Sequence, residues 1–139
     1  LGVMRLSLLL LLPSLCLLVA CDRATEIDLS AAPADAIERG VELMPTHCLT
    51  CHGVGELEED EMLAPPLRSV RARYLARYTE PGAFVDAMTN IVVDPQPEKS
   101  LMPEAVERYG LKAPVSLSKE KIRAVIWAIY AGEVERPAW

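Results

Sequence analysis

Three residues whose side chains can bind metals or form covalent bonds stand together in the segment HCLTCHG: Cys48, Cys51 and His52. A Cys-x-x-Cys pair can act as a redox dithiol, bind zinc or close a disulfide. When a histidine follows directly, the pair can instead attach a haem covalently. Each use requires different surroundings, so the rest of the sequence decides among them.

Three of the four uses lack their usual surroundings. A thioredoxin-like dithiol follows a strand in a βαβ unit, and no Val/Ile-rich strand precedes Cys48. For zinc, Cys51 and His52 are adjacent, and His47 is the only other histidine. A disulfide across so short a loop would constrain the unfolded chain very little. The motif therefore favours one covalently bound haem c.

The spacing of the motif also suits a haem. Residues three apart on a helical turn share a face, so the sulfurs of Cys48 and Cys51 can both reach the vinyl groups along one haem edge. His52 then lies under the ring and offers a nitrogen to the iron as the proximal ligand. His47 is too close in sequence to reach the opposite face of the iron, and we expect it to be partly exposed beside the haem edge.

The N-terminal segment has the order of an export signal. Arg5 precedes an apolar run, 6–20, which Pro13 and Ser14 interrupt and which is short for a membrane span. The residues LVA before Cys21 resemble the lipobox of bacterial lipoproteins, in which cleavage exposes a cysteine for lipidation. An ordinary secretory signal with an incidental cysteine is the alternative.

The lipoprotein interpretation divides the chain into a signal peptide, a polar tether and one domain, at 1–20, 21–32 and 33–139. Cys16 leaves with the signal, and Cys21 carries the lipid. Asp22 resembles the signal that keeps some bacterial lipoproteins at the inner membrane. We therefore expect a periplasmic domain with a lipid anchor in the inner membrane rather than the outer membrane.

Length and charge limit the possible partners. The chain has 139 residues, a formal net charge of −6 and a pI near 4.9. That length suits one small domain plus a targeting segment. Nucleic-acid binding needs clustered Lys and Arg, so an acidic chain argues against it. The acidic run ELEEDE at 56–61 could steer a basic protein partner, although a solvated loop is the simpler interpretation.

Helical periodicity recurs along the chain without strand alternation, so we expect an all-α domain. A first helix follows Pro33 and ends at Pro45. Its apolar face is formed by Ile37, Gly40, Val41 and Met44. A glycine inside a helix is unfavourable, so Gly40 indicates close approach by another backbone or a ring.

The last helix, within 116–133, is the expected partner of Gly40. Ser118 is its N-cap and Gly132 its C-terminal stop. Its core stripe is formed by Ile122, Val125, Ile126 and Ile129. Two further helical patterns lie between these ends, at 67–78 and 79–92, and the second is broken by Asp94, Pro95 and Pro97.

Over 33–132 the chain resembles a small bacterial cytochrome c of the single-haem, all-helical class. Gly40 and Met44 match the small and bulky apolar positions of that family's N-terminal helix. Trp127 and Tyr130 match the aromatic pair of its C-terminal helix. The resemblance implies a cytochrome c fold, in which these two helices cross over a covalently bound haem.

The resemblance also implies partners for the haem iron and for His52. The segment APPL at 64–67 is similar to the family's proline segment, where a proline carbonyl, here assigned to Pro65, accepts a hydrogen bond from the proximal imidazole. Met102, in the segment SLMPEA, is the expected sixth ligand of the iron. Pro103 favours an extended backbone at Met102, and Met-Pro resembles the family's distal ligand segment.

Other residues fit these roles less well. Met88 is the alternative sixth ligand, but a methionine on an apolar helix stripe is usually core. Met44 is too near Cys48 in sequence, and Met62 borders the acidic loop. One of the arginines after the proline segment could neutralise a haem propionate; they are Arg68, Arg71, Arg73 and Arg77.

Coordination by His52 and Met102 would leave no open position on the iron, so the expected function is single-electron transfer rather than catalysis. The domain would be a membrane-tethered electron carrier with redox proteins as partners. A fixed cytochrome subunit of an oxidoreductase complex is the alternative. A ligand-binding haem sensor would require that Met102 does not bind. Because the chain has few aromatic residues, we expect the haem to form much of the core.

Overall fold

Helices build the whole fold. The computed structural model describes residues 26–53, 61–111 and 113–134, and within these ranges it contains helices and turns but no strand. The prediction of an all-α domain is therefore confirmed. The predicted signal peptide, the lipidation residue Cys21 and residues 56–60 of the acidic run lie outside the described residues. In the part of the chain that is described, no helix is long and apolar enough to cross a membrane.

The first helix, α1, spans Ala36–Met44 and ends at Pro45, as predicted. The sequence did not predict that a second helical turn follows directly. The chain continues through a π-helical turn, Pro45–Leu49, into α2, Thr50–His52. Proline has no N–H to donate, and its ring crowds the carbonyl four residues back. The wider π turn accommodates both effects without stopping the rotation of the chain. The cysteine pair and His52 therefore continue directly from α1.

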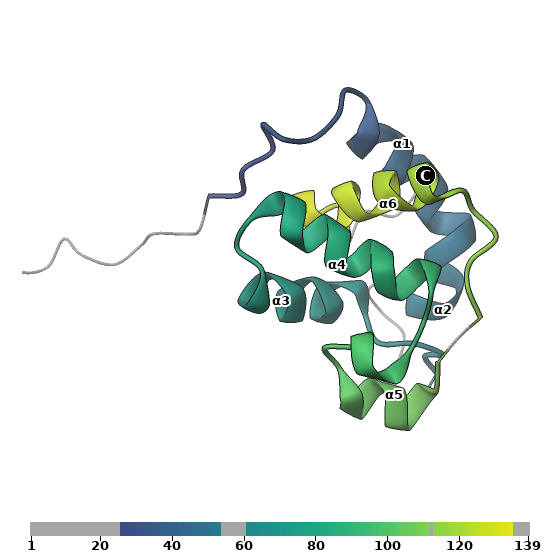
Figure 1. Cartoon of the computed structure of the whole chain (residues 1–139). Helices are drawn as coiled ribbons and strands as arrows, with labels where there is room; N and C mark the ends of the chain where they lie inside the picture. The colour runs from purple at the N-terminus through teal and green to yellow at the C-terminus, as the bar shows by residue number, and fades with distance from the viewer. Residues whose placement is uncertain (1–25, 54–60, 112, 135–139) are drawn as a thin grey trace, which may run out of the picture.

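α1 crosses the last helix, α6 (Lys119–Ala131) (Figure 1). Gly40 lies at this crossing. A Cβ atom built on Gly40 would lie 2.1 Å from the carbonyl oxygen of Ala124 and 2.9 Å from Cβ of Ala128. The close approach predicted from this glycine is therefore confirmed, and its partner is the last helix. The absence of a side chain at Gly40 lets the two backbones touch.

The face of α1 that packs on the core is narrower than predicted. Ala36, Gly40 and Met44, spaced four residues apart, are its buried residues. Ile37 and Val41 were expected on the same face but are only half-buried at its edge. The crossing requires small side chains, so the branched residues lie beside it rather than in it.

α6 begins and ends as predicted. The Ser118 hydroxyl accepts a hydrogen bond from the Lys121 backbone N–H at 3.3 Å, and Gly132 ends the helix with φ 94°. Arg71 donates from Nε and Nη2 to the Tyr130 carbonyl at 3.1 and 3.0 Å, which satisfies a carbonyl in the last turn. The predicted stripe is buried: Ile122, Val125, Ile126 and Ile129.

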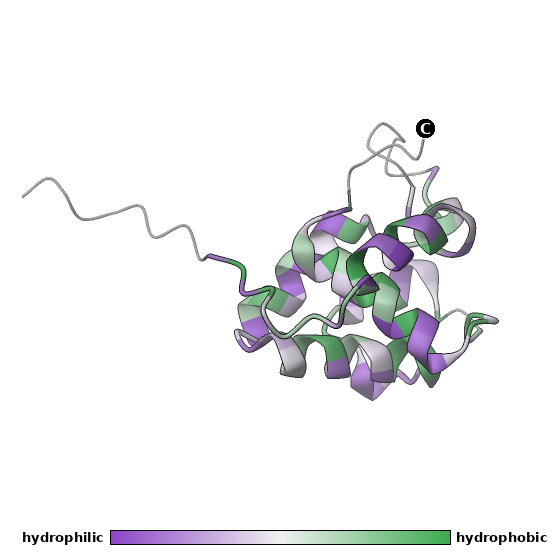
Figure 2. Cartoon of the chain, turned by 90° about the horizontal axis from the view of Figure 1, so that it is seen from above, coloured by the Kyte–Doolittle hydropathy of each residue, from purple (hydrophilic) through white to green (hydrophobic). Residues whose placement is uncertain are grey.

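Two middle helices, α3 (Leu67–Arg77) and α4 (Pro81–Val93), lie at the positions that the sequence predicts. Aromatic rings connect them to α6: Tyr74, Phe84 and Tyr130 follow one another with centroid distances of 6.1 and 5.0 Å. Phe84, at the centre, has no exposed surface. Figure 2 shows apolar and polar residues interspersed along the visible helices, as expected for elements with one buried face.

After α4 the chain forms a short 3₁₀ turn, Pro97–Lys99, and then α5, Pro103–Tyr109. This segment was predicted to be irregular, so the short helix α5 is a correction. Pro103 occupies its first turn, where a missing N–H costs nothing. Seven residues are too few to show a helical period in the sequence. Met102 is the N-cap of α5, with φ −127° and ψ 68°, so its backbone is not in the extended conformation that Pro103 was expected to favour.

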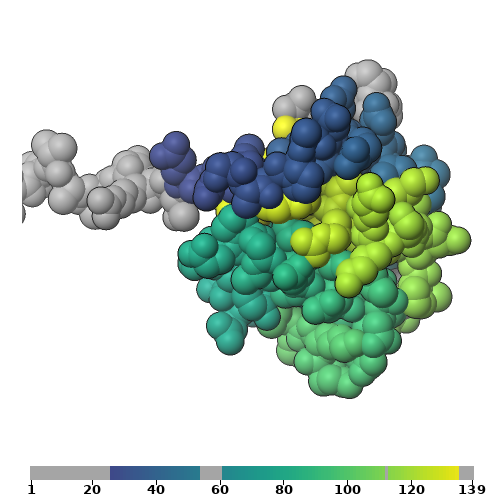
Figure 3. Space-filling model, turned by 45° about the horizontal axis from the view of Figure 1, so that its top comes forward, coloured from purple at the N-terminus to yellow at the C-terminus, as the bar shows by residue number. Residues whose placement is uncertain are grey.

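The segment before α1 lies along the domain. Ile27 and Ala32 pack against the core. Burial raises the pKa of Tyr130, and the nearby Asp28 carboxylate raises it further. In Figure 3 the segment that leads into α1 lies directly beside the C-terminal helix. Two residues of the predicted tether, Ile27 and Ala32, thus contact the domain, and 21–25 lie outside the described residues.

Candidate functional site

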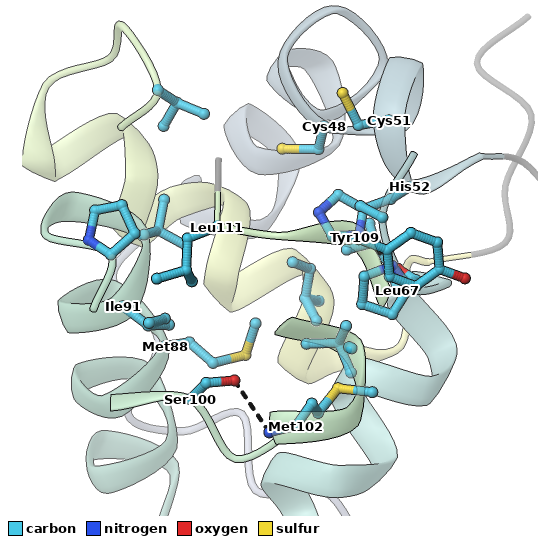
Figure 4. A pocket seen from close by; sticks show the side chains of 18 of the residues that line it. Cys48, Cys51, His52, Leu67, Met88, Ile91, Ser100, Met102, Tyr109 and Leu111 are labelled. Atoms are coloured by element: carbon cyan, nitrogen blue, oxygen red, sulfur yellow. Dashed lines mark hydrogen bonds between the residues drawn. The ribbon is translucent and has the colours of Figure 1, made fainter. Parts of the chain in front are cut away.

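The residues that the sequence selected face one cavity, with a volume of about 260 Å³ (Figure 4). A single buried water needs only roughly 10–15 Å³. Cys48, Cys51, His52, Pro65 and Met102 all line this cavity. They come from α2 and the turn before it, from the loop before α3 and from the start of α5. Figure 4 shows the cysteines and Met102 at opposite ends of the cavity.

The wall of the cavity is mostly apolar. α3, α4 and α5 contribute aliphatic side chains, and α6 contributes its entire buried stripe. Among the described residues that line the cavity, none is Asp, Glu, Lys or Arg. A wall of this kind favours a large apolar ligand that is oriented by a few polar groups.

His52 is held by the proline segment. Its Nδ1 lies 2.6 Å from the Pro65 carbonyl oxygen, which is the contact assigned to Pro65 from the sequence. A carbonyl can only accept, so Nδ1 carries the proton and Nε2 keeps a free lone pair. Burial lowers the pKa of His52, and the bond to Pro65 opposes this only in part. The imidazole is therefore neutral near pH 7, as a metal ligand must be.

Local backbone explains why the Pro65 carbonyl is available. Pro65 is followed by Pro66, the N-cap of α3, whose φ and ψ of −52° and 137° keep the segment extended before Leu67. The side chains of Ala64 and Leu67 are buried on either side. Two successive prolines restrict the chain, and the carbonyl of Pro65 is fixed toward His52.

The two cysteines are half-buried free thiols. Burial and the neighbouring Cys51 raise the pKa of Cys48 to about 11, so its thiol is protonated near pH 7. Dithiol exchange requires a thiolate, so this environment opposes the redox-dithiol interpretation. In the described ranges, no three His, Cys, Asp or Glu side chains are grouped so that they could hold a metal ion. The zinc interpretation gains no support from this arrangement.

Two methionines reach the cavity. Met88, in α4, is 3% exposed, and Met102 is half-buried. Met44 and Met62 do not line the cavity. Both candidates for the sixth ligand, Met88 and Met102, thus line the same cavity. The two methionines that the sequence disfavoured do not line it. The backbone N–H of Met102 donates to the Ser100 hydroxyl at 3.1 Å, which holds Met102 outside the helical register.

Three of the four arginines of α3 have partners outside the cavity. Arg71 binds the Tyr130 carbonyl, Arg73 pairs with Glu104, and Arg77 lies over the Tyr78 ring. No arginine is among the described residues that line the cavity. Neutralisation of a propionate by one of the four stays a prediction.

The rim of the cavity carries exposed residues. Leu63 and Leu111 are 55% and 38% exposed, although both line the cavity. His47 is exposed and also lies at the cavity.

Sequence reasoning missed some polar residues of the wall. Ser100 and Tyr109 line the cavity, and Tyr74 adds a hydroxyl from α3. A serine two residues before a Met-Pro pair is a usable signal, because a hydroxyl there can accept the methionine N–H. Tyr109 carried no such signal.

Comparison with known proteins gives little further information. An uncharacterized protein of Aquifex aeolicus (strain VF5) is 26% identical over 124 residues, which cover 77% of this chain and 82% of the relative. No protein-family model matches the chain, and no solved structure matches it at a significant level. The chain is thus similar to a protein whose name assigns no function.

Proposed function

We propose that this chain is a membrane-tethered, periplasmic cytochrome c that transfers single electrons. One observation carries the proposal. His52, immediately after a Cys-x-x-Cys pair, keeps Nε2 free at an apolar cavity because Nδ1 is bonded to the Pro65 carbonyl at 2.6 Å. Two thiols lie beside it, and Met102 lies at the opposite end of the same cavity (Figure 4).

The donor set fits a haem c. Cys48 and Cys51 would hold it by thioether bonds, and His52 and Met102 would be its axial ligands. A neutral imidazole and a thioether are the ligands of electron-transfer haems, whereas thiolates would be expected at a zinc site. Met88 stays the alternative to Met102, since it lines the same cavity.

Each residue would have a physical role. When bound, the haem supplies the one-electron couple of its iron. The Pro65 carbonyl fixes the His52 tautomer and makes the imidazole a better donor. A Met102 thioether favours the reduced iron, and the apolar stripe of α6 disfavours the extra charge of the oxidised state. Both effects raise the reduction potential.

The proposed location rests on the N-terminal sequence. Lipidation of Cys21 would anchor the domain to the inner membrane, and redox proteins would be its donor and acceptor. The same haem chemistry would serve in a fixed subunit of an oxidoreductase complex. Detergent extraction separates these two cases, because a fixed subunit co-purifies with its complex at constant stoichiometry and a carrier does not.

Covalent attachment is the first test. The full chain is produced in a periplasm that attaches haem, and the purified protein is unfolded and separated on a denaturing gel. We expect haem to remain on the wild-type chain and to be lost from Cys48→Ala/Cys51→Ala. A wild-type chain that carries no haem under these conditions would refute the proposal.

Ligation of the iron is the second test. We expect wild type to show the weak red band of a thioether bound to ferric iron and to resist carbon monoxide when reduced. Met102→Ala should lose the band and bind the gas. Met62→Ala is the matched control, because Met62 does not line the cavity. A Met88→Ala variant that loses the band while Met102→Ala keeps it would transfer the ligand role to Met88.

A further inference from the structure

A second cavity lies on α1, apart from the cavity that contains the cysteine motif. It is an open groove of about 610 Å³, formed by α1, by the residues just before it and by Glu133 after α6. No described residue lines both this groove and the first cavity. The groove is therefore a separate feature, and the proposed haem chemistry does not account for it.

The apolar part of the groove follows from the crossing of α1 and α6. The small residues Ala36 and Gly40 occupy that contact, and the branched residues next to them, Ile37 and Val41, are left half-buried. Both pack against the core and also line the groove, together with Pro33. A ligand in the groove would therefore cover apolar surface that the fold itself leaves partly exposed.

The rest of the groove is acidic. It is lined by four carboxylates, Asp35, Glu38, Glu42 and Glu133, and no Lys or Arg is among the described residues that line it. Asp35, Glu38 and Glu42 are exposed, and within the described ranges no side chain forms an ion pair with them. The groove thus combines apolar surface with negative charge.

These carboxylates are unfavourable for α1 itself. Glu38 and Glu42 are four residues apart on the helix, where like charges repel. Glu42 also lies in the last turn, which contains no basic residue although the helix dipole favours a cation there. Asp35 is the N-cap, but its side chain makes no cap hydrogen bond and its φ of 60° is left-handed. A cationic ligand would compensate for these costs.

The chemistry of the groove selects among cationic ligands. In the described part of the chain, no three His, Cys, Asp or Glu side chains are grouped to hold a metal ion. A metal ion would also leave the apolar surface of Ile37 and Val41 uncovered. An anionic lipid surface would be repelled by the carboxylates. A peptide segment that carries both Lys or Arg and apolar side chains matches both parts of the groove.

We propose that this groove docks a cationic, amphipathic segment of a protein partner. Its apolar side chains would cover Ile37 and Val41, and its Lys or Arg side chains would pair with Glu38 and Glu42. The inference goes beyond the proposed function and does not depend on haem. Because the groove shares no described lining residue with the first cavity, docking and electron transfer can use different surfaces of the chain.

The test uses a synthetic helical peptide of about 14 residues, with leucines on one face and lysines on the other. Its binding to the haem-loaded full chain is measured by titration calorimetry. Glu38→Lys/Glu42→Lys should weaken binding roughly tenfold at low salt. Glu98→Lys/Glu107→Lys makes the same charge change at exposed residues outside the groove, and it should stay within about twofold of wild type.

A second pair of variants tests the apolar contact. Val41→Thr keeps the shape of the side chain and replaces one methyl group by a hydroxyl, so it should weaken binding roughly fourfold. Val93→Thr is the matched control, because Val93 is 38% exposed and does not line the groove. A peptide with glutamates in place of the lysines should bind Glu38→Lys/Glu42→Lys but not wild type, which shows that this variant is folded.

Three outcomes would overturn the proposal. If both charge-reversed variants weaken binding equally, the peptide responds only to net charge. If Val41→Thr and Val93→Thr bind alike, the apolar surface is not covered. Residues 135–139, outside the described residues, include Arg136 and Trp139. If the peptide binds only after Arg136→Ala/Trp139→Ala, this segment of the chain itself is the occupant, and a protein partner is the wrong one.

Discussion

Replacing Gly40 by alanine adds a methyl group inside the crossing of α1 and α6. That methyl would lie 2.1 Å from the Ala124 carbonyl oxygen and 2.7 Å from its carbon. Ordinary contacts begin at 3.4 Å, so the helices would have to separate by at least 1.3 Å, the difference between 3.4 and 2.1 Å. The obstructing atoms belong to a backbone, and no rotation of a side chain can relieve the contact.

The expected cost follows from two opposing effects. Overpacking in a core costs about 1–3 kcal/mol, and a rigid backbone contact belongs at the upper end. Alanine gains up to about 1 kcal/mol over glycine in a helix. Gly40→Ala should therefore lower the free energy of unfolding by about 2 kcal/mol, which lowers Tm by roughly 8–16 °C in a domain of this size.

Thermal and denaturant unfolding of the haem-loaded protein, followed by far-UV dichroism, measures this change. Gly82→Ala is the matched control. Gly82 lies in the first turn of α4, and a Cβ there would meet no atom within 4 Å. It should be neutral or raise stability by about 0.4–1 kcal/mol. If Gly40→Ala is as stable as Gly82→Ala, the direct contact between the two backbones is refuted.

Three further predictions concern single side chains. Ser118→Ala removes the N-cap of α6 and should cost about 0.5–2 kcal/mol in the free energy of unfolding, whereas Ser116→Ala in the preceding turn should have little effect. Arg71→Ala removes two hydrogen bonds to the Tyr130 carbonyl and should cost about 1–3 kcal/mol in the same assay, and Arg71→Lys should recover only part of this because lysine lacks the planar fork. Burial raises the pKa of Tyr74 above its ordinary 10.0, so the unfolded chain loses that proton first as pH rises. Stability should therefore be unaffected by this group below pH 10 and fall above it, and Tyr74→Phe should show a smaller alkaline loss in pH-dependent unfolding.

Local signals in the sequence determined most of the helices. Ser118 and Gly132 mark the ends of α6 because caps act within one turn of the chain. The apolar stripe of α6 and the breaks after α4 follow from periodicity and from proline chemistry. Gly40 indicated a close contact because an unfavourable residue inside a helix needs compensation. The spacing of Cys48, Cys51 and His52 indicated a haem motif for the same local reason.

Local rules did not predict the features that depend on packing between distant segments of the chain. Pro45 ends α1 as predicted, but the π-helical turn that follows it and leads into the cysteine motif was not predicted. α5 was missed because seven residues show no period. The hydrogen-bond partner of Arg71 was not predictable, since the Tyr130 carbonyl is 59 positions away in the sequence.

The sequence by itself thus determined the types of chemical groups and the helices that carry them. Only the tertiary structure decided which groups meet. It brings both Met88 and Met102 to the same cavity, and it bonds Arg71 to the Tyr130 carbonyl. The physical reason is that caps, turns and periodicity are interactions between near neighbours, whereas a cavity wall joins residues from distant segments through packing that no single segment specifies.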